Sequence, residues 1–271
     1  IRFPFKLAKY YEQYKDWKYS NAQLIRRKDK NYYLNVQVKS ELPNHTENHE
    51  VLGIDCGIYN IVTLSNNTFF NSRKLRNVKG RYRKLRRDLQ IKGTKSAKKR
   101  LRITSGKENR FVKDVNHCIS KEITNLDYGV FAIEDLKNIK SRRYNKKVNI
   151  LLGSWSYAQF QTFLGYKAMR LGKSVIKIAP EYTSQQCSRC GNIAKENRNG
   201  HIFKCIACGF ELHADLNASR NIARIGRTDS CRVSVNHPNV VHDEIKDIAI
   251  CNAIECNDKP HPKPYRLGCG N

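Results

Sequence analysis

Two pairs of cysteines constrain this chain more than any other feature of its sequence. They stand as two Cys-x-x-Cys pairs, with fourteen residues between the pairs: Cys187/Cys190 and Cys205/Cys208. A gap of two residues lets both thiolates of a pair reach one ion from a tight turn, and the intervening residues suffice for two short strands. Gly191 and Gly209 follow the pairs, where such turns require a positive φ. The pattern predicts a tetrahedral four-cysteine site with structural zinc, in a ribbon over residues 182–212.

The charge of the chain indicates its partners. Lys and Arg number 51 against 24 Asp and Glu, which gives a net charge of +27 over 271 residues. Such an excess favours nucleic acid first and an anionic membrane surface second. The sequence holds no apolar run of the roughly 18 residues that span a bilayer and no signal-peptide pattern. We therefore expect no membrane partner and a cytoplasmic, nucleoid-associated protein.

The ten cysteines allow two interpretations. They could form a disulfide scaffold, but the chain is long for one and four of the ten stand at zinc spacing, which favours a reducing compartment. The cysteines and histidines beyond residue 228 match no metal-binding spacing, and the prolines there predict an irregular tail.

Carboxylates follow apolar segments at three places. Asp55 ends a short apolar strand that begins at Val51, Glu134 and Asp135 end a second strand from residue 129, and Asp215 begins a helical run. Burial of a carboxylate is costly unless a cation accompanies it, although an Asp that caps a turn is an alternative for Asp55. Alternation along a strand points Glu134 and Asp135 to opposite faces, so at most one of them shares a site with Asp55.

This order of strand Asp, strand Glu and helix Asp is the one that a ribonuclease H-like sheet needs to bring three carboxylates to two divalent ions. Phosphodiester hydrolysis uses such a site, because one ion lowers the pKa of the attacking water and both ions stabilise the negative charge on the phosphorane and the leaving oxygen. We therefore expect an α/β fold with a mixed sheet of this type.

A strongly basic segment lies between the first two acidic strands. Residues 73–113 hold eighteen Lys and Arg against Asp88 and Glu108. Apolar residues at intervals of three and four predict a helix, a break at Gly93 and Thr94, and a second helix to about residue 123, which together make a helical hairpin over 72–126. Charge runs are usually solvated faces, but one of a single sign repels itself unless phosphates neutralise it. The candidate phosphate-binding residues are Arg81, Arg83, Lys84, Arg86, Arg87, Lys98, Lys99 and Arg100.

Two further segments complete the expected organisation. Residues 17–38 alternate apolar and polar on both sides of a charged turn, which predicts a β-hairpin. Apolar residues from 155 to 171 line one face of a helix that Gly172 ends, which favours core packing. The predicted parts are 1–50 (β-hairpin and linker), 51–181 (sheet core with the insertion 72–126), 182–212 (ribbon), 213–227 (last acidic motif and helix) and 228–271 (irregular tail).

At these motifs the chain resembles the TnpB (OrfB) family of transposon-encoded proteins, relatives of the type V CRISPR effectors. In this chain, GIDCGIYNIV resembles the first RuvC motif of the family and AIEDL resembles the second. TSQQCSRCG…CIACG resembles the zinc ribbon of the family, and HADLNASRNIA resembles its third motif. The resemblance spans roughly residues 19–225. It implies a RuvC/ribonuclease H-like nuclease in which Asp55, Glu134 and Asp215 hold two Mg²⁺ ions, with Glu134 rather than Asp135 as the catalytic member.

The resemblance also implies partners. These are a guide RNA from the transposon end, a DNA target cut beside a short flanking motif, and a transposase encoded by the same element. Family members begin with a wedge and recognition region, and we expect residues 1–50 to be a remnant of its β domain with a linker. Two alternatives remain. One is a truncated, catalytically silent, repressor-like nucleic-acid-binding protein, and the other is the transposase itself, for which no His–hydrophobe–His motif with a Tyr is evident.

Overall fold

The structure is a computed structural model that describes residues 9–27, 30–135 and 156–233. The chain forms two compact units, and the boundary between them lies between Glu41 and Leu42. The first unit contains the 3-10 helix η1 (Lys9–Tyr14) and the antiparallel strands β1 (Lys18–Arg26) and β2 (Tyr32–Lys39). The predicted β-hairpin is thus confirmed. Most of the predicted tail lies outside the described residues.

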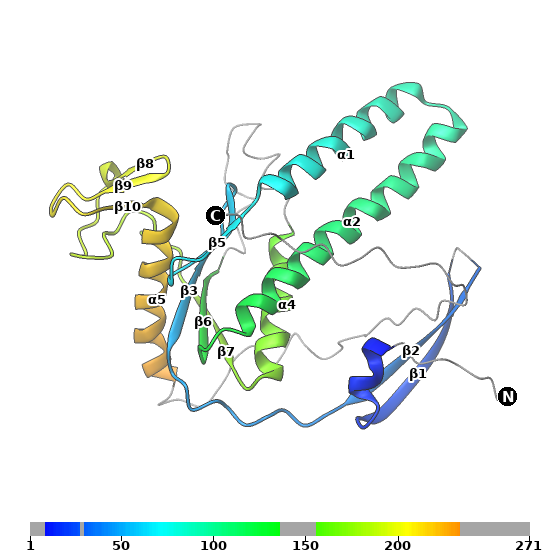
Figure 1. The fold of residues 1–271 in the computed structure, drawn as a ribbon, viewed down its shortest axis with the longest axis horizontal. Coiled ribbons are helices and arrows are strands. Elements are labelled where there is room, and N and C mark those ends of the chain that lie inside the picture. Colours follow the sequence, from blue (N-terminus) through cyan, green and yellow to red (C-terminus); the bar gives the residue numbers. More distant parts are fainter. Residues whose placement is uncertain (1–8, 28–29, 136–155, 234–271) are drawn as a thin grey trace. The chain divides into compact units, whose positions relative to one another are not determined.

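A five-stranded mixed sheet forms the centre of the second unit (Figure 1). Its strands, in the order β5-β4-β3-β6-β7, are β5 (Phe69–Asn71), β4 (Asn60–Leu64), β3 (Val51–Asp55), β6 (Val130–Glu134) and β7 (Ser174–Ile178). Strands β3, β6 and β7 run parallel, whereas β4 and β5 return antiparallel. The mixed α/β fold predicted from the acidic motifs is therefore confirmed.

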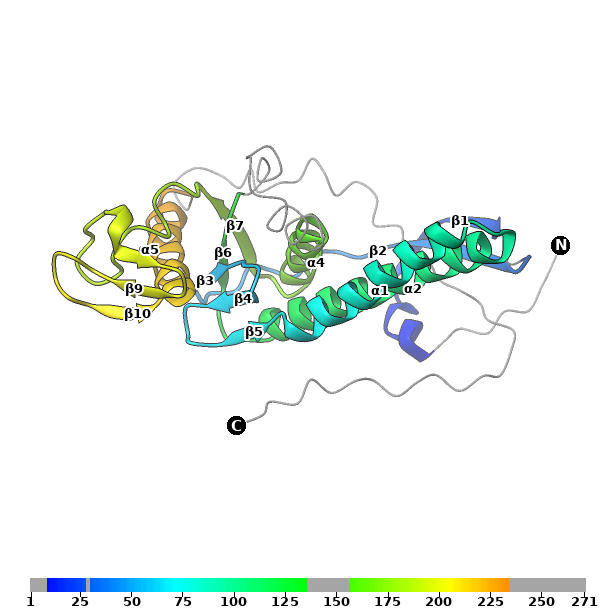
Figure 2. The ribbon, with the colours of Figure 1, turned by 90° about the horizontal axis from the view of Figure 1, so that it is seen from above.

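Helices cover both faces of this sheet. Figures 1 and 2 show α4 (Tyr157–Arg170) with the sheet-proximal end of α2 on one face and α5 (Ala214–Val233) on the other. Leu52, Ile54, Phe131 and Ile133 belong to a core cluster with residues of α2 and α4. The alternate strand positions Val51, Val130 and Ala132 instead pack with Ile222 of α5. Odd positions of β3 and even positions of β6 therefore face α5.

Helix α5 lies directly on β3. A Cβ atom at Gly53 would stand 2.0 Å from the carbonyl oxygen of Ser219 and 2.5 Å from the amide nitrogen of Ala223, so this approach requires glycine. The helix continues to Val233, six residues beyond its predicted end at 227. Residues 227–233 contain neither proline nor glycine, and nothing in their local sequence ends a helix earlier.

The basic insertion is a helical hairpin between β5 and β6, as predicted. Helices α1 (Arg73–Lys92) and α2 (Lys95–Thr124) run antiparallel away from the sheet (Figure 2). Gly93 adopts a φ of 62° after α1, and the Thr94 hydroxyl accepts a hydrogen bond from the Ala97 amide at the start of α2. Between the helices, the buried carboxylate of Glu108 pairs with Lys79 and Arg86.

The segment between β7 and α5 forms a small ribbon. It contains the 3-10 turn η3 (Lys195–Asn197) and an antiparallel sheet in the order β10-β9-β8, with β8 (Arg198–Asn199), β9 (Ile202–Lys204) and β10 (Glu211–His213). Strand β10 leads directly into α5. Within the described parts of the chain, no helix has the length and apolar character needed to cross a membrane.

Candidate active site

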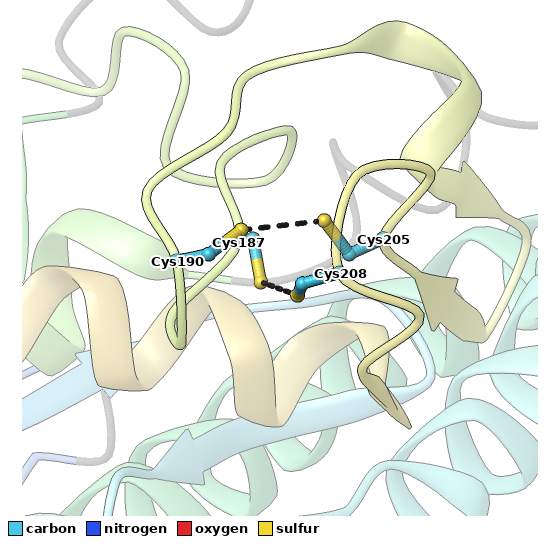
Figure 3. A group of neighbouring side chains, drawn as sticks. All are labelled: Cys187, Cys190, Cys205 and Cys208. Carbon is cyan, nitrogen blue, oxygen red and sulfur yellow. Dashed lines mark hydrogen bonds between the residues drawn. The ribbon is translucent and has the colours of Figure 1, made fainter.

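The four ribbon cysteines meet at one point (Figure 3). The sulfur of Cys187 lies 3.8 Å from that of Cys208, the sulfur of Cys190 lies 3.5 Å from that of Cys205, and all four lie within 4.8 Å of one another. Four Zn–S bonds of about 2.3 Å in a tetrahedron separate the sulfurs by about 3.8 Å. Gly191 and Gly209 have φ angles of 81° and 68°, as the spacing predicted. The donor set and its geometry fit a structural zinc ion.

Strand register brings the first two carboxylates together. Ile54 of β3 pairs with Ile133 of β6 in parallel, so the next residues, Asp55 and Glu134, end neighbouring strands at the same level. Asp55 continues the odd positions of β3 and Glu134 the even positions of β6, and both sets face α5. Alternation turns Asp135 to the opposite face.

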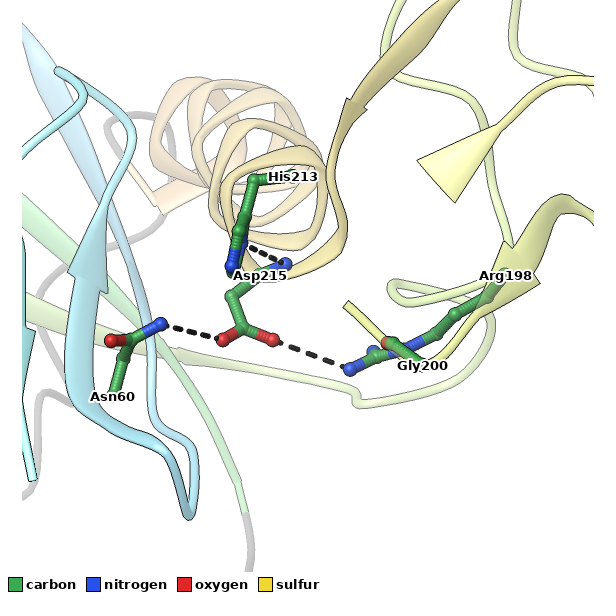
Figure 4. Close-up of polar contacts among 5 residues, drawn as sticks. All are labelled: Asn60, Arg198, Gly200, His213 and Asp215. Carbon is green, nitrogen blue, oxygen red and sulfur yellow. Dashed lines mark hydrogen bonds and ion pairs between the residues drawn. The ribbon is translucent and has the colours of Figure 1, made fainter. Parts of the chain in front are cut away.

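Asp215 completes this group from the first turn of α5, where it is only 7% exposed. Its Oδ2 accepts a hydrogen bond from the Asn60 amide at 3.0 Å, and its Oδ1 lies 3.3 Å from the Arg198 guanidinium (Figure 4). Its backbone amide donates to Nδ1 of His213 at 3.2 Å. Residues from β4 and the ribbon thus hold the carboxylate in place.

The electrostatics of the group call for a cation. Burial raises the pKa of Asp55 well above its ordinary value, the negative charges of Glu134 and Asp215 raise it further, and Arg198 opposes the shift. Burial likewise raises the pKa of the neighbouring Cys56 thiol. Carboxylate oxygens are the ligands that Mg²⁺ prefers, so the donor set fits this ion.

A chain of hydrogen bonds connects the ribbon, α5 and Glu134. The buried Thr183 hydroxyl, just before the ribbon's first turn, donates to Oε1 of Glu134 at 2.5 Å. Asn221 of α5 donates to the carbonyl oxygens of Thr183 and Gln186 at 2.9 and 2.7 Å. Asn217, one helical turn earlier, also donates to Gln186 at 2.7 Å. The orientation of Glu134 therefore depends on the docking of the ribbon on α5.

The predicted phosphate-binding residues lie in the middle of α1 and near the start of α2. Seven of the eight are exposed, and the exception is Arg86, whose guanidinium is half-buried against Glu108. Arg87 also lies 3.7 Å from Asp88, but this pair is open to solvent. The exposed residues form a cationic surface on both helices, made of Arg81, Arg83, Lys84, Arg87, Lys98, Lys99 and Arg100.

Sequence reasoning missed three residues that contact the acidic group. Asn60 and Thr183 carry no charge and stand in ordinary turn and loop sequence. Arg198 lies seventeen residues before Asp215 and reaches it from β8 of the ribbon sheet. The register of the ribbon strands is the signal that could have located Arg198, because it folds β8 and β9 back toward the start of α5.

Two family models match this chain. A family model for OrfB of IS605, described as a probable transposase, matches residues 32–142, and a model described as Cas12f1-like, TNB domain, matches residues 157–222.

Individual relatives carry related names. A CRISPR-associated endodeoxyribonuclease Cas12f1 from Sulfoacidibacillus thermotolerans is 45% identical over 118 residues, which are 42% of this chain and 27% of the relative. A putative RNA-guided DNA endonuclease InsQ from Escherichia coli K12 is 29% identical over 222 residues, which are 72% of this chain and 54% of the relative. The chain thus spans about half or less of the length of these curated relatives.

Solved structures show the same fold. A Cas12f1-sgRNA-target DNA complex matches with a TM-score of 0.53 and 25% identity, over 73% of this chain and 54% of that one. A CRISPR-Cas12f ternary complex matches with a TM-score of 0.55 and 25% identity, over 77% and 46% of the two chains. The matched segments hold the acidic motifs and the four-cysteine ribbon, and the solved structures share the mixed α/β fold, so this chain is similar to OrfB, TnpB-like and Cas12f proteins.

Proposed function

We propose that this chain is an RNA-guided DNA endonuclease that hydrolyses phosphodiester bonds at Asp55, Glu134 and Asp215. The names of its relatives supply the reaction and substrate, since they are called endodeoxyribonuclease and RNA-guided DNA endonuclease. A structural neighbour supplies the partners, since it is a complex with an sgRNA and a target DNA. For this chain the guide would come from the transposon end, and a transposase of the same element would be a further partner.

One observation carries the proposal. The carboxylates of Asp55, Glu134 and Asp215 converge on the α5 face, where burial and then the charges of Glu134 and Asp215 raise the pKa of Asp55. A fold keeps such mutual repulsion at a functional site when a bound cation offsets it. Two Mg²⁺ ions, when bound there, would activate the attacking water and neutralise the charge that develops on the phosphate.

The chain's own residues would orient this site. Thr183 fixes one oxygen of Glu134, and Asn60 fixes one oxygen of Asp215. Arg198, which lies beside Asp215, retains further N–H donors that can contact a phosphate oxygen of the bound strand. The exposed cations of the helical hairpin would bind the nucleic-acid backbone without reading its sequence.

The adjacent carboxylates Glu134 and Asp135 offer a matched test. The full chain, copurified with RNA from its host, would be incubated with duplex and single-stranded DNA and Mg²⁺. We expect Glu134→Gln, like Asp55→Ala and Asp215→Ala, to abolish cleavage but keep DNA binding, because the site makes few of the phosphate contacts. Asp135→Asn should cleave at close to the wild-type rate, because its side chain faces away from the site.

Three results would overturn the proposal. Cleavage that survives Glu134→Gln would exclude the assigned carboxylates, and equal losses in Glu134→Gln and Asp135→Asn would contradict the role of strand alternation. Binding without any cleavage by the wild-type chain with RNA would instead favour a catalytically silent nucleic-acid-binding protein.

A further inference from the structure

Two histidines of the ribbon lie beside the acidic site: His213 in β10, and His201 in the turn directly before β9. His213 of β10 pairs across the sheet with Ile202 of β9, and the amide of Ala214 donates to the carbonyl oxygen of His201 at 2.8 Å. The two imidazole rings are nearly parallel, with centroids 5.9 Å apart and an interplanar angle of 23°. Antiparallel pairing thus holds two potential metal ligands next to each other.

Asp215 adds a carboxylate to this pair. A ligand atom from each of His201, His213 and Asp215 lies within 4.8 Å of the others. Bonds of about 2.1 Å to one ion need ligand atoms within about 4 Å of one another, so a small rotation of the side chains completes the set. His201 is exposed, which gives it the freedom to rotate and gives an ion a route from solvent.

Aromatic residues of the sheet hold the two imidazoles. The ring of Tyr59 meets His201 edge-on at 4.8 Å between centroids, and the ring of Phe69 meets His213 edge-on at 5.2 Å. These contacts place an aromatic ring beside each imidazole, while the exposed side of His201 stays open to an ion.

The existing partners of the three residues leave room for an ion. Asn60 and Arg198 each occupy one position on the two oxygens of Asp215, and a carboxylate has about four acceptor positions. Nδ1 of His213 accepts the Asp215 amide, so ligation by His213 replaces that hydrogen bond, either at Nδ1 itself or at Nε2 after the ring proton moves to Nδ1. The positive charge of Arg198 opposes binding, and the charge of Asp215 offsets it.

We propose that His201, His213 and Asp215 form a binding site for a first-row transition-metal ion, with Zn²⁺ as the ion to test. Imidazole ligands favour zinc and its neighbours in the periodic table, whereas Mg²⁺ prefers a site made of oxygen ligands alone. The site is therefore distinct in chemistry both from the four-cysteine site and from the group of three carboxylates, although it shares Asp215 with the latter.

This sharing gives the site a regulatory consequence, which rests on the proposed nuclease function. An ion held by His201 and His213 draws Asp215 away from the other two carboxylates and adds positive charge beside them. Zn²⁺ in excess of the amount in the ribbon would thus slow Mg²⁺-dependent cleavage by this chain.

The test begins with zinc binding by the full chain, so that it does not depend on activity. Zinc would be titrated calorimetrically into protein whose ribbon is already loaded, and bound zinc would be counted after gel filtration. We expect His201→Ala and His213→Asn each to bind one equivalent fewer than the wild type. The asparagine can still accept the Asp215 amide, so His213→Asn keeps the helix start intact. His45→Ala, which removes an exposed imidazole before β3, should bind as much zinc as the wild type.

The outcomes separate this proposal from the proposed function. Equal zinc content in the wild type, His201→Ala and His213→Asn would overturn the site, because any additional zinc would then bind elsewhere in the chain. If the variants lose the equivalent, added Zn²⁺ should inhibit wild-type cleavage more than that of His201→Ala. Absence of cleavage in every protein would refute the nuclease but leave the zinc counts to decide the site, and equal inhibition of both proteins would refute the regulatory role.

Discussion

Replacement of Gly53 by alanine would separate α5 from the sheet at the place where the acidic site depends on their contact. The new Cβ would stand 2.0 Å from the carbonyl oxygen of Ser219 and 2.5 Å from the amide nitrogen of Ala223, and neither backbone atom can rotate away. Ordinary contact begins at 3.4 Å, so α5 has to move by more than 1 Å. Overpacking of this kind costs about 3 kcal/mol. In a unit of this size the melting temperature should fall by about 6–12 °C.

The same displacement should affect catalysis more than stability. Asp215 begins α5, so a shift of the helix moves this carboxylate relative to Asp55 and Glu134. A misplacement of about 1 Å at a catalytic site can lower the rate by about 100-fold. The assays are thermal unfolding and Mg²⁺-dependent DNA cleavage, the latter at a temperature well below the melting point of the variant.

Gly165→Ala provides the control. Gly165 lies within α4, and a Cβ atom there would meet no atom within 4 Å. Alanine favours a helix over glycine by about 1 kcal/mol, so this variant should melt about 2–4 °C higher than the wild type and cleave normally. A wild-type melting temperature for Gly53→Ala, or full cleavage by it, would refute the packing of α5 on β3 as the basis of the site.

Three further predictions test other parts of the structure. Glu108→Gln removes the buried charged partner of Lys79 and Arg86 and should lower the free energy of unfolding, measured in urea, by about 2 kcal/mol. The control Glu122→Gln, on the exposed face of the same helix, should change this free energy by less than about 0.5 kcal/mol. Similar losses in both variants would contradict the buried pairing. Without divalent ions, Asp55→Asn should raise the melting temperature at pH 7.5, because burial and two neighbouring carboxylates raise the pKa of Asp55. This gain in melting temperature should shrink as the pH falls through the raised pKa toward 3.8, since a protonated Asp55 no longer opposes folding. A variant that melts below the wild type at pH 7.5 would contradict the raised pKa of Asp55. Removal of zinc with a chelator should increase amide hydrogen exchange in the ribbon and the first turn of α5 but not in the helical hairpin, and uniform exchange across the unit would argue against a local role for the metal.

The features that the sequence predicts well are those with local causes. The cysteine spacing predicts the ribbon because each turn is built within five residues, and Gly93 with Thr94 predicts the hairpin break because each residue favours its own backbone conformation or cap. Alternation also predicts that Glu134 and Asp135 face opposite ways. It does not decide between them, because the answer depends on which face α5 covers.

The remaining features arise from contacts between segments that are far apart in the chain. Arg198 reaches Asp215 only through the register of the ribbon strands, and Thr183 reaches Glu134 across 49 residues. In the sequence, nothing distinguishes Arg86 from the basic residues around it, but the approach of α2 brings Glu108 against it. No periodicity within a single segment encodes these pairs.

The hydrogen bonds that Asn217 and Asn221 make to the first turn of the ribbon also limit how the protein can move. A ribbon that swung away from α5 would break these bonds and, through Thr183, release Glu134 at the same time. Opening of the ribbon and loss of the acidic site are therefore a single event in this fold. If the proposed function holds, a DNA strand would reach the acidic group without a hinge motion of the ribbon.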